Sequence, residues 1–422
     1  MNRAMKTTKA CMAIGALSAF LLLTHSVGAQ TGTALHSFKS KEGASPMLGL
    51  VFDSSGNLYG VAGEEGASRN GSVFELVRSG SVWTEKTLHS FTGASDGGTP
   101  RGTLVFDKSG NLYGTVKLGG ANGVGAVYEL TKSASGTWSE TVLHNFGAGK
   151  DGQYPGGNLI FDAAGNLYGT TEGGGAFGNG SENVGGAAYK LAPPAKSGGS
   201  WTETVIHSFG NGADGVSPKA NLLLDAVGNV YGTTMLGGNL GGGTAFEISP
   251  QNKGGWIEKV LYNFGVIFNG NKPATGLIFD SSGNLFGTTT RGGLLGGGTG
   301  GGVVFELSPS SGGTWTETDL CDFELSFGGP SLLYSNLVFD TQGNLYGTTL
   351  QGWFSNPAVG TVFEMTPAGG GTWNCGAILD FSGIGGAKPA VGALIFDSAG
   401  NLYGATQDGG VNNEGLVFKI TF

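Results

Sequence analysis

The residues best suited to acid–base or metal chemistry are four histidines that recur at one position of a repeated segment. They are His36, His89, His144 and His207. Later copies of the segment carry other residues there, namely Tyr262, Cys321 and Leu379. Histidine is the usual general base and metal ligand, but a position that also accepts tyrosine, cysteine or leucine is typical of packing. We therefore expect the histidines to be structural, and the sequence predicts no catalytic residue.

Aspartates in a repeated D-x-x-G-N motif are the next candidates, because such turns resemble calcium loops. They are Asp53, Asp107, Asp162, Asp225, Asp280, Asp340 and Asp397. Calcium needs several converging oxygen ligands, and each motif supplies one carboxylate. Aspartate also accepts hydrogen bonds from the backbone of a tight turn. We interpret all seven as structural turn residues, interpret Asp96, Asp151 and Asp214 of the D-G-x-x-P loops in the same way, and predict no metal.

Two further motifs give no clear chemistry. A G-x-G-x-x-G pattern spans Gly173 to Gly178, but no helix follows to bind a phosphate, so no nucleotide cofactor is expected. Cys321 and Cys375 stand at opposite ends of the fourth strand-like run in neighbouring copies. A disulfide between them stays open, and neither has a histidine in its own copy that would activate a nucleophile.

Ligand-binding candidates are the places where the copies differ, chiefly between the second and third strand-like runs. They are Trp353, Phe354, Arg101, Lys117, Glu172, Arg291 and Asp408. The third copy also inserts residues between Glu172 and Gly186. Aromatic and polar side chains on one surface could hold a sugar or a peptide. Taken singly, each residue could equally be an ordinary solvated loop residue.

The seven motifs recur every 54 to 63 residues, which indicates a repeat architecture. Each copy contains four strand-like runs, for example 102–106, 111–116, 126–130 and 138–146. The 84 glycines occupy fixed places between these runs, so they indicate turns and not disorder. A proline precedes the first run of every copy, where strands tolerate it. The sequence predicts an all-β fold, a seven-bladed β-propeller with four antiparallel strands per blade.

The two ends of the repeat region are complementary. The last copy finishes after its third run, at 415–422, and residues 34–38 resemble a fourth run with no blade before it. We expect the N-terminal strand to join the last blade, which would close the ring and protect its edges. Residues 30–422 would then be one domain. An open solenoid is the alternative.

Residues 1–29 have the features of a secretory signal peptide. Arg3, Lys6 and Lys9 precede an apolar run from Cys11 to Leu23, and small residues at 27–29 suit cleavage. A retained membrane anchor is the alternative, although the run is short for a span. We expect a secreted or periplasmic protein. The net charge of −9 argues against nucleic acid or an anionic membrane as partner.

The motifs F-D-x-x-G-N-L-Y-G-T-T, V-F-E-L and W-T-E-T-V-L-H-S-F together resemble the GloVer tandem repeat of bacterial secreted choice-of-anchor proteins. The resemblance covers residues 30–422, and a more distant similarity extends to NHL-type and lyase-type propellers. It implies a secreted propeller with no assigned activity. Some relatives carry C-terminal anchoring signals; this chain ends inside its last blade, which leaves surface attachment open.

Three functions remain after this reasoning. The favoured one is a secreted, non-catalytic propeller that binds a glycan, a peptide or a partner protein. The second is a propeller enzyme, a lyase or hydrolase of an extracellular polymer or small molecule, which would need ionisable groups from several blades to converge. The third is a rigid envelope platform. The sequence indicates neither the ligand nor the oligomeric state.

Overall fold

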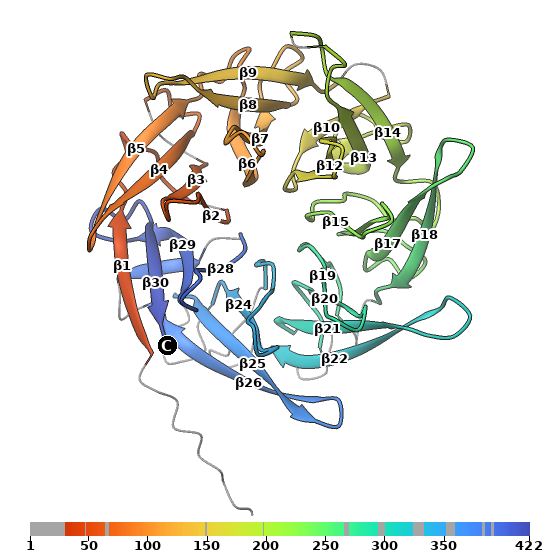
Figure 1. Cartoon of the computed structure of the whole chain (residues 1–422). Coiled ribbons are helices and arrows are strands. Elements are labelled where there is room, and N and C mark those ends of the chain that lie inside the picture. The colour runs from red at the N-terminus through yellow and green to blue at the C-terminus, as the bar shows by residue number, and fades with distance from the viewer. Residues whose placement is uncertain are drawn as a thin grey trace, which may run out of the picture.

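The computed structural model describes residues 30–46, 48–63, 67–147, 150–196, 198–265, 270–293, 300–323, 333–351, 359–381, 385–389 and 392–422. Within these ranges the chain forms seven antiparallel sheets, arranged as blades around a central axis (Figure 1). The predicted seven-bladed propeller is confirmed. Among the same residues, no helix has the length and apolar character that crossing a membrane requires.

The blades follow one another along the chain, and short inner strands face the axis. Blade 1 contains β2–β5 (Val51–Phe52, Leu58–Ala62, Ser72–Ser79, Val82–Ser90), blade 2 contains β6–β9 (Gly98–Phe106, Leu112–Leu118, Ala126–Lys132, Trp138–Asn145), and blade 3 contains β10–β14 (Gly152–Pro155, Ile160–Phe161, Leu167–Gly174, Glu182–Ala192, Thr202–Ser208). Blade 4 contains β15–β18 (Leu223–Leu224, Val230–Thr234, Thr244–Pro250, Trp256–Asn263), blade 5 contains β19–β22 (Ile278–Phe279, Leu285–Thr288, Gly302–Pro309, Trp315–Phe323), and blade 6 contains β23–β26 (Val338–Phe339, Leu345–Thr349, Thr361–Gly369, Thr372–Asp380). Blade 7 contains β27–β30 (Gly386–Pro389, Ile395–Phe396, Leu402–Gly409, Leu416–Thr421) and β1 (Thr31–Ser37).

The outermost strand of blade 7 comes from the other end of the chain. β1 pairs antiparallel with β30, from Thr31 opposite Thr421 to Ser37 opposite Leu416. Figure 1 shows the two strands side by side, one red and one blue. The Phe38 amide continues the pairing by donating to the Gly415 carbonyl at 3.0 Å. The first and last described segments therefore share one sheet.

The D-x-x-G-N aspartates organise the turns between the inner strands. In blade 2, Asp107 Oδ1 accepts the amides of Ser109 and Asn111, both at 2.8 Å. Its Oδ2 accepts the Asn111 side-chain amide at 2.9 Å. One carboxylate thus satisfies three donors of a tight turn, which is the role expected for aspartate there.

Adjacent blades meet along surfaces that we call seams, and most of the core lies in them. In blades 1 to 6 a tryptophan at the start of the outer strand packs on the preceding blade. Five such pairs are Tyr403–Trp83, Tyr59–Trp138, Tyr113–Trp201, Tyr168–Trp256 and Phe286–Trp373, with centroids 6.0 to 6.5 Å apart. Trp315 packs on the cluster that contains Tyr231. These edge-to-face contacts add to the free energy of burial.

Backbone hydrogen bonds join the blades on the face that carries the loops between second and third strands. The residue before the proline of one blade has a positive φ and donates its amide to the preceding blade. Tyr154 (φ 60°) donates to the Val124 carbonyl, and Ser217 (φ 58°) donates to the Gly185 carbonyl, both at 2.8 Å. Non-glycine residues rarely adopt this conformation, so interblade bonding holds them there. These bonds fix the loops around one end of the central channel, which we call the mouth. They therefore also fix the side chains that the loops carry there.

Candidate ligand site at the mouth of the channel

Charged side chains from three consecutive blades converge at the channel mouth. Lys117 Nζ of blade 2 lies 3.2 Å from Glu172 Oε2 of blade 3, and Lys219 Nζ of blade 4 lies 3.3 Å from the same oxygen. Glu172 is 6% exposed. A buried carboxylate is costly unless it is paired, and here two ammonium groups pair with it. We call Lys117, Glu172, Glu182 and Lys219 the mouth cluster.

Repetition explains why these residues meet. Lys117 and Glu172 occupy the same repeat position, directly after Y-G-T-V and Y-G-T-T on β7 and β12. Because adjacent blades repeat around the axis, equivalent positions become neighbours at the mouth. Gly156 lies under the carboxylate, where a Cβ atom would stand 2.7 Å from Glu172 Oε1. Any larger residue at position 156 would displace Glu172.

The insertion in blade 3 supplies the outer part of the cluster. Glu182 begins β13, and its Oε2 lies 3.0 Å from Lys117 Nζ. The next residue, Asn183, has a φ of 62° and accepts a hydrogen bond from Ser217 Oγ at 3.0 Å. The insertion therefore covers one side of the lysine pair and links blade 3 to blade 4.

Arg101, a further predicted residue of blade 2, is half-buried. It stands opposite Thr115 in the β6–β7 pairing, two residues before Lys117 and on the same side of the strand. Arg101 and Lys219 each follow the proline of their blade. The sequence analysis selected Arg101 and missed Lys219, although the shared position after proline was a signal that could have identified it.

The other predicted ligand residues lie apart from the mouth cluster. Arg291 is exposed in blade 5, where its carbonyl accepts the Asn271 amide at 2.7 Å. Asp408 of blade 7 pairs with Lys388 Nζ at 3.0 Å. Trp353 and Phe354 fall outside the described residues. From the predicted set the structure brings together Lys117 and Glu172, and it places Arg101 on the neighbouring strand of blade 2, opposite Thr115. Arg291 and Asp408 do not join them.

Below the cluster the channel is narrow. Lys219 also lines a cavity of about 50 Å³ whose wall includes Asn158, Asn221 and Asn336. The Asn158 amide donates to Asn221 Oδ1 at 2.8 Å, and the Gly276 amide donates to Asn336 Oδ1 at 2.6 Å. These interblade bonds draw the inner strands together around the axis. A space of this size takes one or two water molecules, so a larger ligand would remain at the mouth.

The cluster is equipped to hold an anion. Each lysine ammonium has three donors and no acceptor, and Lys219 makes one ion pair with Glu172. The two lysines place positive charge beside the buried Glu172 in a chain of net charge −9. An incoming carboxylate or sulfate could compete with Glu172 for the lysines.

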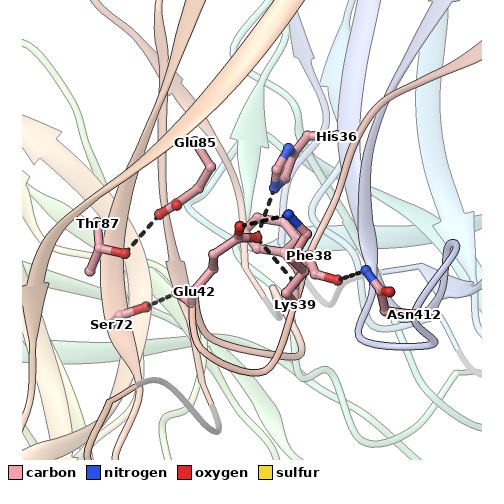
Figure 2. Close-up of polar contacts among 8 residues, drawn as sticks. All are labelled: His36, Phe38, Lys39, Glu42, Ser72, Glu85, Thr87 and Asn412. Carbon is pink, nitrogen blue, oxygen red and sulfur yellow. Dashed lines mark hydrogen bonds and ion pairs between the residues drawn. The ribbon is translucent and has the colours of Figure 1, made fainter.

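The histidines lie far from this cluster, on the outer strands of blades 7, 1, 2 and 3. His36 Nε2 lies 3.2 Å from Glu42 Oε2, a contact shown in Figure 2. The equivalent contacts are His89–Asp96 at 3.4 Å, His144–Asp151 at 3.4 Å and His207–Asp214 at 3.1 Å. Each histidine also packs on the phenylalanine two residues later. This geometry is a repeated interblade contact, as expected for structural histidines.

A half-buried glutamate of the next blade faces each histidine–carboxylate pair. Figure 2 shows Glu85 on β5 beside Glu42, with Thr87 Oγ1 donating to Glu85 at 3.0 Å. Burial raises the pKa of Glu85, Glu140 and Glu258, each to about 7. The carboxylates of Asp96 and Asp214 make a smaller contribution to the raised pKa of Glu140 and Glu258, respectively. Burial lowers the pKa of His36, His89 and His207, against the effect of their carboxylate partners.

Cys321 and Cys375, whose pairing the sequence leaves open, form a disulfide at the same position of another seam. In the seam between blades 5 and 6, Cys321 replaces the histidine and Cys375 replaces the glutamate, and the two form a disulfide with Cα atoms 6.5 Å apart. The pairing was uncertain from sequence because the residues are at opposite ends of their strands. The other seams show that these two positions face each other across the blades.

Within the described ranges, no group of three His, Cys, Asp or Glu side chains could hold a metal ion.

The sequence matches the profile of the Gloeobacter/Verrucomicrobia repeat over residues 21–181, 178–316 and 294–422. The chain belongs to this repeat family. A comparison with curated proteins finds no significant match. The resemblance drawn from the F-D-x-x-G-N-L-Y-G motifs is therefore confirmed at the level of the family.

Solved structures share the propeller fold of this repeat protein at low sequence identity. The ulvan lyase of family PL25, bound to the saccharide GlcA(1-4)Rha3S, aligns with a TM-score of 0.53 and 14% identity, covering 89% of this chain and 93% of that chain. A candidate 6-phosphogluconolactonase from Bacteroides uniformis aligns with a TM-score of 0.52 and 10% identity, covering 88% and 99%. At such identities the likeness shows the fold alone.

Proposed function

We propose that this repeat protein is a secreted binding module that holds an acidic saccharide at the mouth cluster. One observation carries the proposal: Lys117 and Lys219, from blades 2 and 4, meet at the buried carboxylate of Glu172 in blade 3. A surface that merely needed solubility would not gather cations around one desolvated carboxylate. Lys117 and Glu172 share one repeat position, and the equivalent positions of blades 4 and 5 are uncharged, namely Met235 and Thr290.

The chemistry of the cluster favours an acidic ligand over a neutral one. Carboxylate and sulfate groups accept charge-assisted hydrogen bonds from lysine and arginine, and these are stronger than bonds between neutral groups. The net negative charge of the chain would repel a polyanion, so such a ligand would bind where lysine ammonium groups can meet its acidic groups. Sugar hydroxyls could bond to Asn183 and Ser217 at the edge of the cluster.

The choice of probe follows the structural neighbour that holds a glucuronate-containing saccharide. That lyase shares only the fold, so its activity is a competing hypothesis for this chain and not its assignment. A lyase would consume the saccharide and release an unsaturated uronate, which absorbs ultraviolet light. A binding module would leave the saccharide intact.

Isothermal titration with a sulfated glucuronate oligosaccharide tests the proposal. We expect saturable binding that weakens as salt rises, no binding of a neutral oligosaccharide of equal length, and constant ultraviolet absorbance. Lys219→Gln should weaken affinity about tenfold, a loss of about 1.4 kcal/mol. Lys253→Gln removes the same charge from an exposed turn on the opposite face and should have no effect. Equal loss in both variants would refute the site, and rising absorbance would favour the enzyme.

Secretion belongs to the same proposal. The signal-like residues 1–29 favour export, and the Cys321–Cys375 disulfide supports an oxidising compartment, where such bonds persist. A fusion of residues 1–29 to a periplasmic reporter would test this. Retention of the reporter in the cytoplasm would count against it.

A further inference from the structure

The seam between blades 6 and 7 lacks the tryptophan that the other seams contain. In blades 1, 2, 4, 5 and 6 this tryptophan stands opposite a residue at or near the end of the third strand, as Trp138 stands opposite Lys132. In blade 7, Thr31 stands opposite Thr421, so one residue further along, Gln30 faces Phe422. Glutamine is too small and too polar to replace an indole ring in this core position.

A cavity occupies the place that the tryptophan leaves. A space of about 690 Å³ opens between blades 6 and 7, lined by Tyr346, Phe396 and Phe422 among others. A second space of about 660 Å³ adjoins it, shares Gln342, Asn344, Glu364 and Phe422, and reaches Gln30. Both lie on the face that carries the D-x-x-G-N turns, opposite the mouth cluster. We call the two spaces together the seam groove.

The base of the seam groove has the same geometry as the seams that contain a tryptophan, which we call the filled seams. The Tyr346 hydroxyl lies 3.2 Å from Asp340 Oδ2 and 2.6 Å from Glu364 Oε1. In blade 1, the Tyr59 hydroxyl lies 3.2 Å from Asp53 Oδ2 and 2.6 Å from Glu75 Oε1, and its ring supports Trp138. Equivalent aspartate and glutamate residues therefore hold the hydroxyl group of each tyrosine in the same way. Tyr346 presents a surface that receives an indole elsewhere in this molecule.

Phe422 covers the groove only in part. Its ring centroid lies 5.6 Å from that of Tyr346 and 6.4 Å from that of Phe396, yet 49% of Phe422 is exposed. Exposed aromatic rings beside a cavity are typical of binding surfaces. Residues 1–29 contain no tryptophan.

Charge indicates what should accompany the indole. Asp340, Glu364 and Asp397 line the groove, while the lining contains no lysine or arginine among the described residues. In two of the filled seams a cation lies over the tryptophan: Arg78 is 5.8 Å from the Trp83 ring centroid and Lys132 is 5.4 Å from that of Trp138. In blades 4, 5 and 6 a proline stands opposite the tryptophan instead. In blade 7, Phe422 stands at that position, so the cation would come from the ligand.

We propose that the seam groove binds a tryptophan side chain of a partner polypeptide, flanked by lysine or arginine. The filled seams of the same molecule serve as the template for this complex. The site is separate from the mouth cluster, on the opposite face and in different blades. It would let the propeller attach to a protein while its mouth remains free.

Ligand-detected NMR and titration with the acetylated amide peptide Lys-Trp-Lys test the proposal. The matched control Lys-Ala-Lys carries the same charge without the indole and should bind at least about tenfold more weakly. Gln30→Trp should fill the groove from within and abolish binding of Lys-Trp-Lys. Gln251→Trp adds an exposed tryptophan in the turn between β17 and β18 and should leave binding unchanged.

A second variant keeps the test decisive where Gln30→Trp fails to fold. Tyr346→Leu retains much of the volume but removes the aromatic floor, and should weaken Lys-Trp-Lys binding about tenfold with an unchanged circular dichroism spectrum. Lys219→Gln should not affect the peptide, which separates this site from the mouth. Equal binding of the two peptides, or Lys-Trp-Lys binding that survives both groove variants, would overturn the proposal.

Discussion

At the residue scale, the glutamates of the repeated W-x-E motif lie in the seams, and burial there raises their pKa. The W-x-E glutamate is half-buried against the carboxylate of the preceding blade, and burial raises the pKa of Glu258 to about 7. Asp214 across the seam adds to the shift, and His207 lies 3.1 Å from Asp214. Near neutral pH these seams thus contain groups that exchange protons, although none of them lies near the mouth cluster.

Glu258→Gln should change how stability depends on pH. The folded pKa of Glu258 lies above its ordinary value of 4.5, so its stabilisation is complete below pH 4.5 and is lost as pH rises through about 7. His207 acts in the opposite direction, because its lowered pKa costs stability as pH falls below its ordinary 6.5. The variant removes only the first effect. We expect it to match the wild type at pH 4.5 and to exceed it by about 1 kcal/mol at pH 8, after allowance for solvent screening.

Urea unfolding at several pH values measures this difference. Lys253→Gln, at an exposed lysine, serves as the control and should shift stability equally at every pH. A constant difference between Glu258→Gln and wild type from pH 4.5 to pH 8 would show that Glu258 titrates as an ordinary surface group.

At the scale of the elements, the blades are held together by close backbone contacts as well as by side chains. Gly125 has a φ of 103°, and a Cβ atom there would collide with the Pro155 ring of the next blade and stand 2.6 Å from the Val116 carbonyl oxygen. Gly110 in the turn of the same blade has a φ of 84° and open space around it. The two glycines share a backbone conformation and differ in interblade contact.

Gly125→Ala should therefore destabilise the protein more than Gly110→Ala. Alanine at positive φ costs about 1–2 kcal/mol in either place, and the collision with Pro155 adds about 1–3 kcal/mol at position 125. Chemical denaturation of the two variants gives the difference directly. Equal losses of stability in the two variants would mean that the contact with Pro155 between blades 2 and 3 contributes nothing to the free energy of unfolding.

The elements were largely predictable because the turn chemistry repeats. Seven D-x-x-G-N turns with alternating apolar runs indicate strands, and the position of the prolines indicates where each blade begins. The mouth cluster was predictable only in part, since Lys117 and Glu172 differ visibly from their equivalents. Lys219 was missed because the comparison of copies stopped at the loops between second and third strands. The seam groove was missed because its cause is a tryptophan absent from the last blade, which matters only once blades 6 and 7 are adjacent.

At the scale of the whole molecule, the seven seams are not equivalent. Six contain a tryptophan, one of these also contains the Cys321–Cys375 disulfide, and the seventh has neither within the described residues. The seventh seam is also the one where β1 completes blade 7. The Cys321–Cys375 bond joins blades 5 and 6, so the covalent link lies in the seam next to the one that lacks a tryptophan.

Removing the disulfide should lower stability substantially. Cys321 and Cys375 are separated by 54 residues, and closing a loop of this length restricts the unfolded chain by about 2–4 kcal/mol. The double variant Cys321→Ser/Cys375→Ser should lose about that much in urea unfolding, and a reducing agent should affect only the wild type. Wild-type stability that does not respond to reduction would contradict a stabilising bond.

A crystal structure of the complex with a sulfated glucuronate oligosaccharide tests the central claim most directly. The account predicts that an acidic group of the saccharide lies within hydrogen-bond distance of Lys117 or Lys219 Nζ, above the narrow part of the channel, with the ring closed and the saccharide uncleaved. A saccharide bound in the seam groove or on the outer strands, or a mouth left empty at saturating concentration, would contradict it.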